Sequence, residues 1–339
     1  MSREVHVRFW ESVEVRFLRA THLPLYRQEK MFKRYGAQIS RQNMVNWVAQ
    51  VAQWLKPIYN YMRRELISGN YLQIDETPIK VLDPDSSQKK IRQGWLWPIS
   101  RPGEDVVFSW SVTHGSRHLE ELLEGFSGYL QCDGYSAYGK YAREHEAIKT
   151  LGCMAHARRK FKEAESEGQA PLSILREIAK LYGIEKRLRE SDSDAEEIHT
   201  IRQEESLPLL EGLYERILQT RKAVLPRSLT GRACDYALGQ WEALACYVED
   251  GDLQIDNNLI ENAIRPSALG KKNWMFVGHP GAGERSAIIY SLVVSCERHG
   301  VDPSQYLSCV LEEVPYLVNR DQSHLTPKNW AKAKQTQAA

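Results

Sequence analysis

Apolar residues recur at helical spacing in two segments near the N-terminus. In LPLYRQEKMFKRYG, Leu25 and Met31 mark the apolar face, and Gly36 suits the C-terminus of a helix. In RQNMVNWVAQVAQWLKPIYNYMRRELI, apolar residues such as Met44, Val48, Val51 and Leu55 continue the pattern, and Ser40 is a good N-cap. Residues 21–68 therefore predict a helical, helix-turn-helix-like segment, although two packed helices with no role in DNA binding would have the same pattern.

The pattern changes to strands and short helices between residues 69 and 165. Three consecutive strands are predicted in YLQIDETPIKVL, GWLWPIS and EDVVFSWSVTHG, separated by the turn-rich pieces DPDSSQKK and RPG. They are followed by a helix (HLEELLEGF), a strand (YLQCD), a helix (AYGKYAREH), a strand (AIKTLGCM) and a helix (AHARRKFKEAE). Consecutive strands pair antiparallel and strands reached through a helix pair in parallel, so an α/β fold with a mixed five-stranded sheet and flanking helices is expected.

Strand signals disappear from about residue 166 to 250, where an all-helical insertion is predicted. One amphipathic helix is marked by Ile174, Ile178, Leu181, Ile184 and Leu188, and SLPLLEGLYERILQTRKAVL marks another after the acidic linker SDSDAEE. A mixed pattern then returns, with a strand-like NWMFVG, a glycine-rich turn HPGAGE and a helix RSAIIYSLVVSCERHG. The predicted divisions are an unassigned N-terminus (1–20), the helical segment (21–68), a first core segment (69–165), the insertion (166–250), a second core segment (251–320) and a polar C-terminal tail (321–339).

Composition excludes some classes of protein. Hydrophobic residues make up 42% and charged residues 26% of the 339 residues, which is typical of a soluble globular chain. No apolar run approaches the roughly 18–20 residues that span a bilayer, and the N-terminus lacks the apolar core of a signal peptide. The six cysteines show no framework spacing and no CxxC pair, as expected for reduced thiols. We therefore expect a cytoplasmic protein.

Two acids, Asp75 and Glu76, interrupt the first predicted strand. Asp is depleted from strands because its carboxylate competes for backbone hydrogen bonds, so a strand end with a turn completed by Pro78 is one explanation. Asp133 offers another, because it ends the fourth strand, which is the natural neighbour of the first in such a sheet. Adjacent carboxylates repel one another unless a divalent cation neutralises them. An aspartate before glycine is nevertheless also common in ordinary turns.

Glu261, in DNNLIENAIRP, is the third candidate acid. Asn258 can cap a helix that has Glu261 in its first turn, which is close to a capping box and explains Glu261 without any chemistry. Laid beside the strand ends, the same carboxylate would complete an oxygen-ligand site for Mg²⁺ or Mn²⁺. Two such ions, roughly 4 Å apart, activate a nucleophile and stabilise the leaving oxygen in phosphodiester chemistry. Glu76 should point to the opposite face of the strand from Asp75, so a direct role at a shared metal is not expected for it.

Several motifs together resemble the IS66 family of insertion-sequence transposases. They are HLPLYRQE, YLQIDETPIKVLD, LQCDGYSAY, GCMAHARRKF, DNNLIENAIRP with GKKNWMFVG, and GERSAIIYSLVVSCERHGVDPSQYL, and they follow in order from about residue 21 to 320. The resemblance implies an RNase H-like fold with a DDE triad on Asp75, Asp133 and Glu261, and DNA cleavage and strand transfer with two Mg²⁺ ions.

The resemblance also implies partners and one difference. Transposases of this kind act on transposon ends and target DNA as synapsed homo-oligomers, and element-encoded accessory proteins are further partners that it suggests. Relatives usually carry, ahead of HLPLYRQE, a long region with coiled-coil, DNA-binding and cysteine-rich zinc-binding character. This chain has twenty unmatched residues there and looks truncated, so we expect it to be impaired in finding transposon ends unaided.

The formal net charge of +1 conceals local basic clusters. The residues that we expect to contact DNA phosphates are Arg41, Arg158, Arg159, Lys160, Lys271, Lys272 and Arg285. Each phosphate contact would add about 0.9 to the salt dependence of duplex binding, although a solvated surface explains the same residues equally well.

Cys153 and His156 form a C-x-x-H pair, but structural zinc usually takes four ligands and no second pair is evident. GHPGAGERS has Glu284 where a phosphate-binding loop needs lysine, so ATP use is not expected.

Three functions remain open at this level. The leading one is the catalytic region of a metal-dependent DDE transposase. The second is a catalytically silent remnant that only binds DNA or partner subunits. The third is a cellular RNase H-like nuclease, which would hydrolyse DNA or RNA without joining strands.

Overall fold

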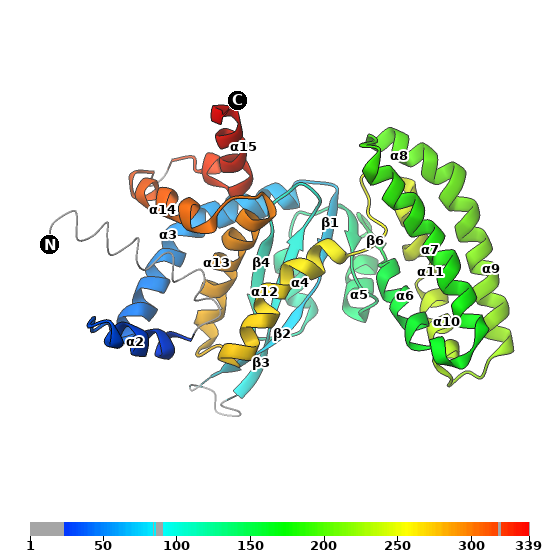
Figure 1. Cartoon of the computed structure of the whole chain (residues 1–339), viewed down its shortest axis with the longest axis horizontal. Coiled ribbons are helices and arrows are strands. Elements are labelled where there is room, and N and C mark those ends of the chain that lie inside the picture. The colour runs from blue at the N-terminus through cyan, green and yellow to red at the C-terminus, as the bar shows by residue number, and fades with distance from the viewer. Residues whose placement is uncertain (1–23, 84, 86–90, 318–319, 339) are drawn as a thin grey trace. The chain divides into compact units, whose positions relative to one another are not determined.

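The computed structural model describes residues 24–83, 85, 91–317 and 320–338. Their contacts divide the chain into two units, one containing the described residues up to Phe126 and from Ile260 onward, the other comprising Ser127–Leu259 (Figure 1). The twenty N-terminal residues and most of the predicted turn at 83–90 lie outside the described residues. Within the described ranges, no helix combines the length and the apolar character needed to cross a membrane.

Two helices open the first unit, as the sequence predicts. Helix α2 (Leu25–Arg34) is followed by Gly36 at φ +81°, a conformation that glycine adopts without strain. Helix α3 (Arg41–Ile67) begins after Ser40, whose side chain accepts a hydrogen bond from the backbone N–H of Asn43. The buried face of α3 contains Leu55, Ile58, Met62 and Leu66, and the helix packs against β4 and α13, which are defined below. Most of α3 is therefore a core helix of this unit.

The first predicted strand is broken in two at the acidic pair. Strands β1 (Tyr71–Ile74) and β2 (Thr77–Leu82) pair antiparallel with β3 (Ile91–Ser100) in one continuous register, with Asp75 opposite Pro98. The Asp75 N–H donates to the Pro98 carbonyl at 3.3 Å, but proline has no N–H to return. The missing inter-strand hydrogen bond divides the first predicted strand into β1 and β2. The described residues therefore form six strands where five were predicted.

Strand β4 (Val107–Ser111) pairs antiparallel with the other edge of β3. One face of these strands forms a core of Ile79, Val81, Leu96 and Phe108 with residues of α12 (Asn258–Trp274) and α13 (Pro280–Arg298). The opposite face contains Trp97, against which His118 of α4 (Ser116–Leu122) packs. Helices therefore flank both faces of the strands in this unit.

Two local predictions near residue 280 are wrong. The segment NWMFVG is not a strand, because α12 continues to Trp274 and only Val277 forms an isolated parallel bridge, to Val81 of β2. The predicted glycine-rich turn is instead the first turn of α13, since Pro280 occupies a position that proline favours in a helix. The His279 side chain accepts the N–H of Gly281 there.

The second unit contains the parallel pair β5 (Gly128–Gln131) and β6 (Ile148–Leu151), connected through α5 (Ser136–Glu144). Helix α6 (Met154–Glu163) follows, and then only helices are found up to residue 249. Those helices are η1 (Glu165–Glu167), α7 (Gln169–Glu190), α8 (Ala195–Ile201), the π-helical η2 (Arg202–Ser206), α9 (Leu207–Ala223), α10 (Leu229–Gly239), α11 (Trp241–Ala245) and η3 (Cys246–Glu249). Antiparallel pairs in the first unit and a parallel pair in the second place the chain in the α/β class, as predicted.

The helical region of the second unit has the apolar stripe that the sequence predicts. All five apolar residues singled out on α7, from Ile174 to Leu188, are buried. The acidic linker is shorter than expected, because Asp194 caps α8 by accepting the N–H of Glu197 at 2.9 Å. A buried ion pair joins α7 to η2, with Arg202 1% exposed and Glu185 4% exposed. Arg202 donates to both carboxylate oxygens of Glu185 at 2.9 and 2.7 Å.

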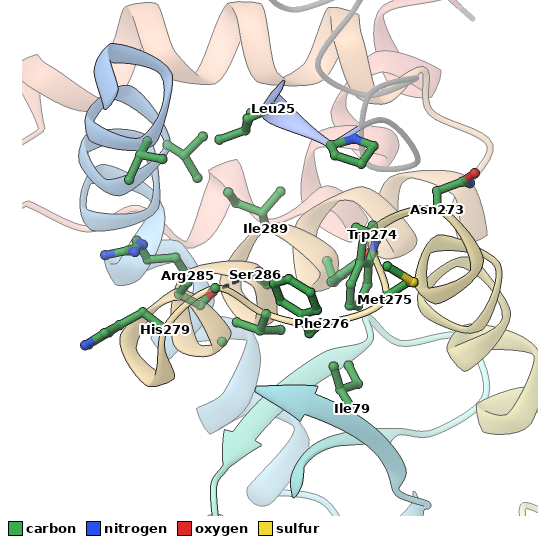
Figure 2. A pocket seen from close by; sticks show the side chains of 18 of the residues that line it. Leu25, Ile79, Asn273, Trp274, Met275, Phe276, His279, Arg285, Ser286 and Ile289 are labelled. Carbon is green, nitrogen blue, oxygen red and sulfur yellow. Dashed lines mark hydrogen bonds between the residues drawn. The ribbon is translucent and has the colours of Figure 1, made fainter. Parts of the chain in front are cut away.

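A cavity of about 630 Å³ lies inside the first unit. Its walls come from α2, α3, the sheet, α13 and the segment that connects α12 to α13, as Figure 2 shows. Arg285 and His279 lie together at one end of the cavity, and Asn273, Trp274 and Met275 lie at the other. Most of its lining is apolar.

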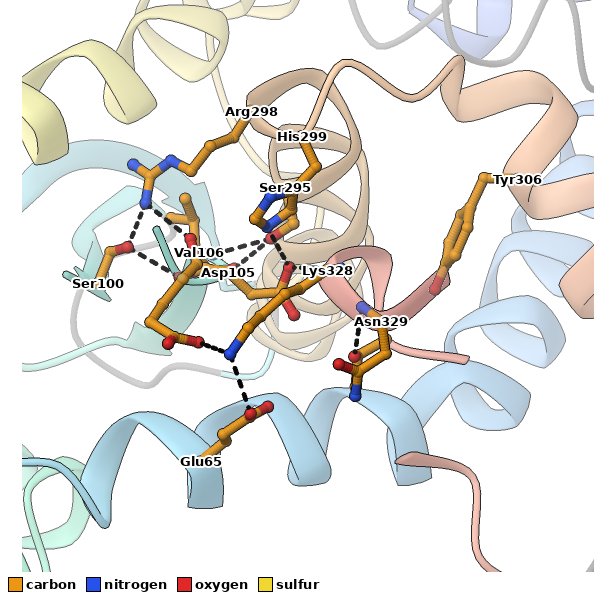
Figure 3. Close-up of polar contacts among 12 residues, drawn as sticks. Glu65, Ser100, Asp105, Val106, Ser295, Arg298, His299, Tyr306, Lys328 and Asn329 are labelled. Carbon is orange, nitrogen blue, oxygen red and sulfur yellow. Dashed lines mark hydrogen bonds and ion pairs between the residues drawn. The ribbon is translucent and has the colours of Figure 1, made fainter. Parts of the chain in front are cut away.

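The C-terminal residues, for which the sequence predicts a polar tail, contain a helix docked on the first unit. Helices α14 (Pro303–Glu313), η4 (Val314–Tyr316), η5 (Ser323–Leu325) and α15 (Pro327–Ala338) follow α13. Lys328, at the start of α15, forms ion pairs with Glu65 at 3.2 Å and with Glu104 at 2.5 Å. Figure 3 shows its side chain directed toward Glu65 of α3. Asp105 accepts the backbone N–H of Lys328 at 3.1 Å and contacts His299 Nε2 at 2.9 Å.

Asp105 gives the stability of this docked helix a pH dependence. Burial raises the pKa of the Asp105 carboxyl above its ordinary value of 3.8, although His299 and the Lys328 N–H oppose the shift. Because the pKa is raised on folding, the folded state binds the Asp105 proton more tightly than the unfolded state does. The stability that this proton adds is complete at low pH and is lost as the pH rises through the folded-state pKa. Asparagine does not titrate, so we expect Asp105→Asn to remove this loss of stability. As the pH rises, the unfolding free energy of the variant should therefore increase relative to that of the wild type. Urea unfolding across the acid range measures it, and parallel pH profiles would contradict it.

Candidate active site

Asp75 lies at the break between β1 and β2 and is half-buried. Its Oδ1 accepts the backbone N–H of Glu76 at 2.8 Å, which holds the carboxylate in one orientation. In the continuous register with β3, Asp75 occupies the same face as Thr77 and Ile79. That face is the one covered by α12 and α13.

Glu76 points to the other face, as strand alternation predicts. Its Oε1 contacts His114 Nε2 at 3.2 Å, and the His114 ring stacks on Trp95 with 4.7 Å between ring centroids. These contacts give Glu76 a structural position apart from Asp75.

Asp133 follows β5 in the second unit, at the strand end where the sequence predicts it. Its Oδ1 accepts the Tyr135 N–H at 2.9 Å, which is the local turn that an aspartate before glycine favours. The ring of Tyr236 packs so closely on Gly134 that an added Cβ would come within 2.9 Å of it. Burial and the nearby Asp133 charge raise the pKa of Tyr236 to about 12, so its hydroxyl stays neutral. No hydrogen bond to Asp133 Oδ2 occurs among the described residues.

Glu261 lies in the first turn of α12 and is half-buried. The predicted cap is displaced, because the helix already includes Asn258, and Asp256 accepts the Asn258 N–H at 3.1 Å. Ile260 and Ala263 on the same helix pack into the core beneath the β2 face. A carboxylate in a first helical turn is favoured by the helix dipole, so Glu261 is compatible with either a capping or a metal-binding role.

The three acids are therefore divided between the units. Asp75 and Glu261 belong to the first unit, and Asp75 lies on the sheet face that Glu261's helix covers. Asp133 belongs to the second unit. The gathering of all three carboxylates around one metal centre stays a prediction.

Lys271 has an internal role that the sequence does not reveal. Its ammonium donates to Thr77 Oγ1 and to the Pro78 carbonyl, both at 2.7 Å, and so ties α12 to the start of β2. Burial lowers the pKa of Lys271, and within the described portion of the chain no carboxylate pairs with it. Lys272, the next residue, is exposed. Of these two candidates for DNA contact, Lys271 already uses its charge to position the helix that carries Glu261.

This difference gives a matched pair of variants. Lys271→Met keeps the apolar stem but removes two hydrogen bonds from a charged donor, so we expect a loss of about 1.5–3 kcal/mol in stability. Lys272→Met should leave stability nearly unchanged and lower the salt dependence of duplex DNA binding by about 0.9. Urea unfolding and binding at several salt concentrations measure both effects. The opposite pattern, with a stable Lys271→Met protein and a smaller salt slope, would contradict this assignment.

The other basic candidates fall in two places. Arg158, Arg159 and Lys160 are exposed on α6, and the two arginines line a small cavity of about 280 Å³ that also includes Tyr182 and Asn258. Arg41, at the start of α3, and Arg285, on α13, line the larger cavity of the first unit although 244 positions separate them in the sequence. The fold thus brings together two of the residues proposed to contact DNA.

Cys153 and His156 lie at the start of α6. The Cys153 thiol is buried and accepts the Asn257 N–H at 3.3 Å, and a His156 ring nitrogen lies within 4.8 Å of it. Two ligands are fewer than structural zinc usually takes, so the question of zinc that the sequence raises stays open.

Sequence reasoning missed the Lys271 anchor and the apolar cavity. Both depend on contacts between segments far apart in the chain, and no local pattern reports such contacts. The one available signal was the cluster of aromatic and apolar residues in NWMFVG, which the sequence pattern attributes to a strand.

Comparison with known proteins identifies the family. The family model described as Transposase IS66 family matches residues 18–285, a span that contains all three candidate acids. In Sinorhizobium fredii (strain NBRC 101917 / NGR234), the uncharacterized protein y4jD is 34% identical over 336 residues, covering 94% of this chain and 65% of the relative. The uncharacterized protein y4qI of the same organism is 33% identical over 311 residues, covering 87% and 57% respectively. The chain spans about three fifths of the length of these curated relatives. With most of its residues covered by the family model, the chain belongs to the IS66 family of transposases.

Proposed function

We propose that this chain is the catalytic region of a DDE transposase that cleaves and joins DNA strands with a divalent metal. The observation that carries the proposal is the position of Asp75. It interrupts a strand opposite Pro98, on the sheet face that is covered by the helix carrying Glu261. A half-buried carboxylate within a strand pattern opposes strand preference, and such local conflicts are typical of functional sites. Membership of the IS66 transposase family supports this reaction class.

The elements also agree with the RNase H-like fold that we infer for the chain. Antiparallel strands β1 to β4 come first, and the parallel strands β5 and β6 follow, each preceded by a helix. Asp133 comes two residues after the end of β5, and Glu261 lies on a helix reached only after the helical segment α7 to η3. This order supports catalytic residues placed on separate elements of one core.

The three side chains fit Mg²⁺ or Mn²⁺ better than a softer metal, because all their donors are carboxylate oxygens. A bound divalent ion would activate the attacking water or 3′-hydroxyl and stabilise the leaving oxygen. The protein's own role is to orient the ligands. The Glu76 N–H donates to Asp75 Oδ1 at 2.8 Å, and the Tyr135 N–H donates to Asp133 Oδ1 at 2.9 Å. Lys271 fixes the helix of Glu261 against β2.

The proposed substrates are the ends of the insertion sequence and the target DNA, acted on in the cytoplasm. Linear duplexes carrying those ends should be nicked and joined only when Mg²⁺ or Mn²⁺ is present, with products resolved on denaturing gels. Cleavage without joining would favour an RNase H-like nuclease. Salt-sensitive binding without cleavage under either metal would favour a silent remnant, and in that case the proposal is wrong.

A further inference from the structure

The cavity of the first unit has flat aromatic surfaces. Trp274 lines it from the end of α12 and Phe276 from the segment that follows, and Trp110 and Tyr290 line it from the sheet and α13. Phe276 is 40% exposed, so its ring is accessible from solvent. Met275, between the two aromatic residues, has φ +54°, a strained conformation for a residue with a Cβ. Such strain is common in segments that contact ligands.

Trp110 is held rigidly in the cavity wall. A Cβ added at Gly94 would come within 2.4 Å of its ring, and one added at Gly283 within 2.1 Å, so the ring is clamped between two glycines. Its buried Nε1–H meets no acceptor among the described residues, which is uncommon for a buried donor. Trp110 is therefore a fixed part of the wall that the two glycines cover, and Phe276 supplies the exposed aromatic ring.

The charged side chains that line the cavity are both basic. Arg41 and Arg285 line it, and no aspartate or glutamate does so within the portion of the chain that the structure describes. His279 also lines it and accepts the Gly281 N–H. Neither the Arg41 nor the Arg285 guanidinium makes a hydrogen bond or ion pair to another described residue. Glu284, which adjoins Arg285, is instead paired with Lys56 at 2.8 Å. The cavity is thus complementary to a ligand with an apolar, planar portion and a negatively charged portion.

We propose that this cavity binds an unstacked nucleobase of a DNA strand, with Arg41 and Arg285 contacting the flanking phosphates. This inference rests on DNA being the substrate, as proposed above. Aromatic side chains bind unpaired bases by stacking, and arginine contacts the backbone. The volume of about 630 Å³ falls within the usual range for small-ligand sites, roughly 300–1,000 Å³. The cavity would hold one nucleotide away from the duplex.

The test uses the full chain with a chelator present, so that cleavage does not interfere. The probes are a short single strand with one 2-aminopurine, whose fluorescence is quenched on stacking, and a fully paired duplex. The wild-type protein should quench the probe. Phe276→Ala should lower affinity for the single strand by about 5-fold to 150-fold and abolish the quenching, with duplex affinity unchanged. Phe276→Trp should restore both.

Matched variants separate stacking from charge and from general damage. Arg41→Gln and Arg285→Gln should each lower the salt slope of single-strand binding by about 0.7. Tyr316→Ala removes an aromatic residue that is 76% exposed elsewhere in the same unit and should change nothing. Circular dichroism should match the wild type for each variant, because the chosen side chains are largely exposed or at the cavity edge.

The outcomes distinguish this inference from the proposed function. Equal quenching and affinity for the wild type and Phe276→Ala, with metal-dependent cleavage intact, would overturn the base-binding cavity alone. A change of oligomeric state in Phe276→Ala, without a change in nucleotide binding, would assign the cavity to a second copy of the chain and also overturn it. If the wild-type protein binds neither probe, both this inference and the proposed function fail.

Discussion

Asp75→Asn is expected to reduce metal-dependent strand cleavage by more than about a hundredfold, while DNA binding and the fold are retained. Replacing residues that only support a metal ligand already costs about 10-fold to 100-fold, so loss of a ligand itself should cost more. Asparagine keeps the shape and still accepts the Glu76 N–H, which Asp75 does at 2.8 Å. Product formation per unit time, measured at saturating Mg²⁺ and again with Mn²⁺, reports the loss.

Glu76→Gln is the matched control for that experiment. Glu76 is adjacent in sequence, but it contacts His114 on the opposite face of the strand. We expect this variant to keep cleavage within about tenfold of the wild type, in line with the smaller cost of changes outside the ligand set. Equal losses in the two variants would mean that the strand break, rather than the Asp75 carboxylate, matters for activity. Asp133→Asn and Glu261→Gln should behave like Asp75→Asn, and full activity in either would remove that residue from the triad.

Arg202→Met is expected to destabilise the second unit by about 3–5 kcal/mol, because it leaves a buried carboxylate without its partner. Arg202 also donates to the carbonyls of Tyr247 and Asp250, at 3.0 and 2.9 Å, so these backbone groups lose a partner too. The chain has two units and need not unfold in one step. Hydrogen exchange of the α7 amides at increasing urea follows this unit separately.

Two control variants identify the cause of that destabilisation. Combining Arg202→Met with Glu185→Leu removes both charges, and it should recover much of the lost stability. Arg187→Met breaks an ion pair to Glu205 whose side chains are 57% and 45% exposed, and should cost far less, because exposed ion pairs add little to stability. An Arg202→Met protein as stable as the wild type would show that the buried pair does not hold α7 and η2 together.

The elements predicted best from sequence are those with strong local patterns. Ser40 caps α3 as its sequence context predicts, and the five apolar positions of α7 are all buried. The signals lie within a few residues of the structure they determine, so tertiary contacts do not have to be known. Gly36, at φ +81°, is another example.

The errors arise where a distant partner decides the local structure. The break at Asp75 depends on Pro98, a residue on another strand that lacks the N–H to complete the ladder. The start of α13 at Pro280 was hidden because Gly281 and Gly283 resemble a turn, yet Gly283 is required by its close contact with Trp110. The helix in the polar C-terminal segment is likewise stabilised by contacts of Lys328 with Glu65 and Glu104.

In the candidate site, too, local patterns could be predicted from the sequence and contacts between distant segments could not. The sequence pattern makes Asp75, Asp133 and Glu261 candidates but leaves a turn or a helix cap as an explanation for each. The resemblance to the family's motifs is what implies that they form a triad. The sequence could not reveal that Lys271 anchors the helix of Glu261 to Thr77, since 194 positions separate the two residues. It also could not show that Arg41 and Arg285 line one cavity.

The most direct measurement of the central claim is cleavage of the protein chain by hydroxyl radicals that Fe²⁺ generates when it substitutes for Mg²⁺. Radicals act close to the bound ion, so the cut positions map the residues around it without requiring DNA or activity. We predict cuts in three separate segments, around Asp75, Asp133 and Glu261, all suppressed by excess Mg²⁺ and all lost together in Asp75→Asn. Cuts near only one of the three acids, or cuts that persist in Asp75→Asn, would contradict a shared metal centre.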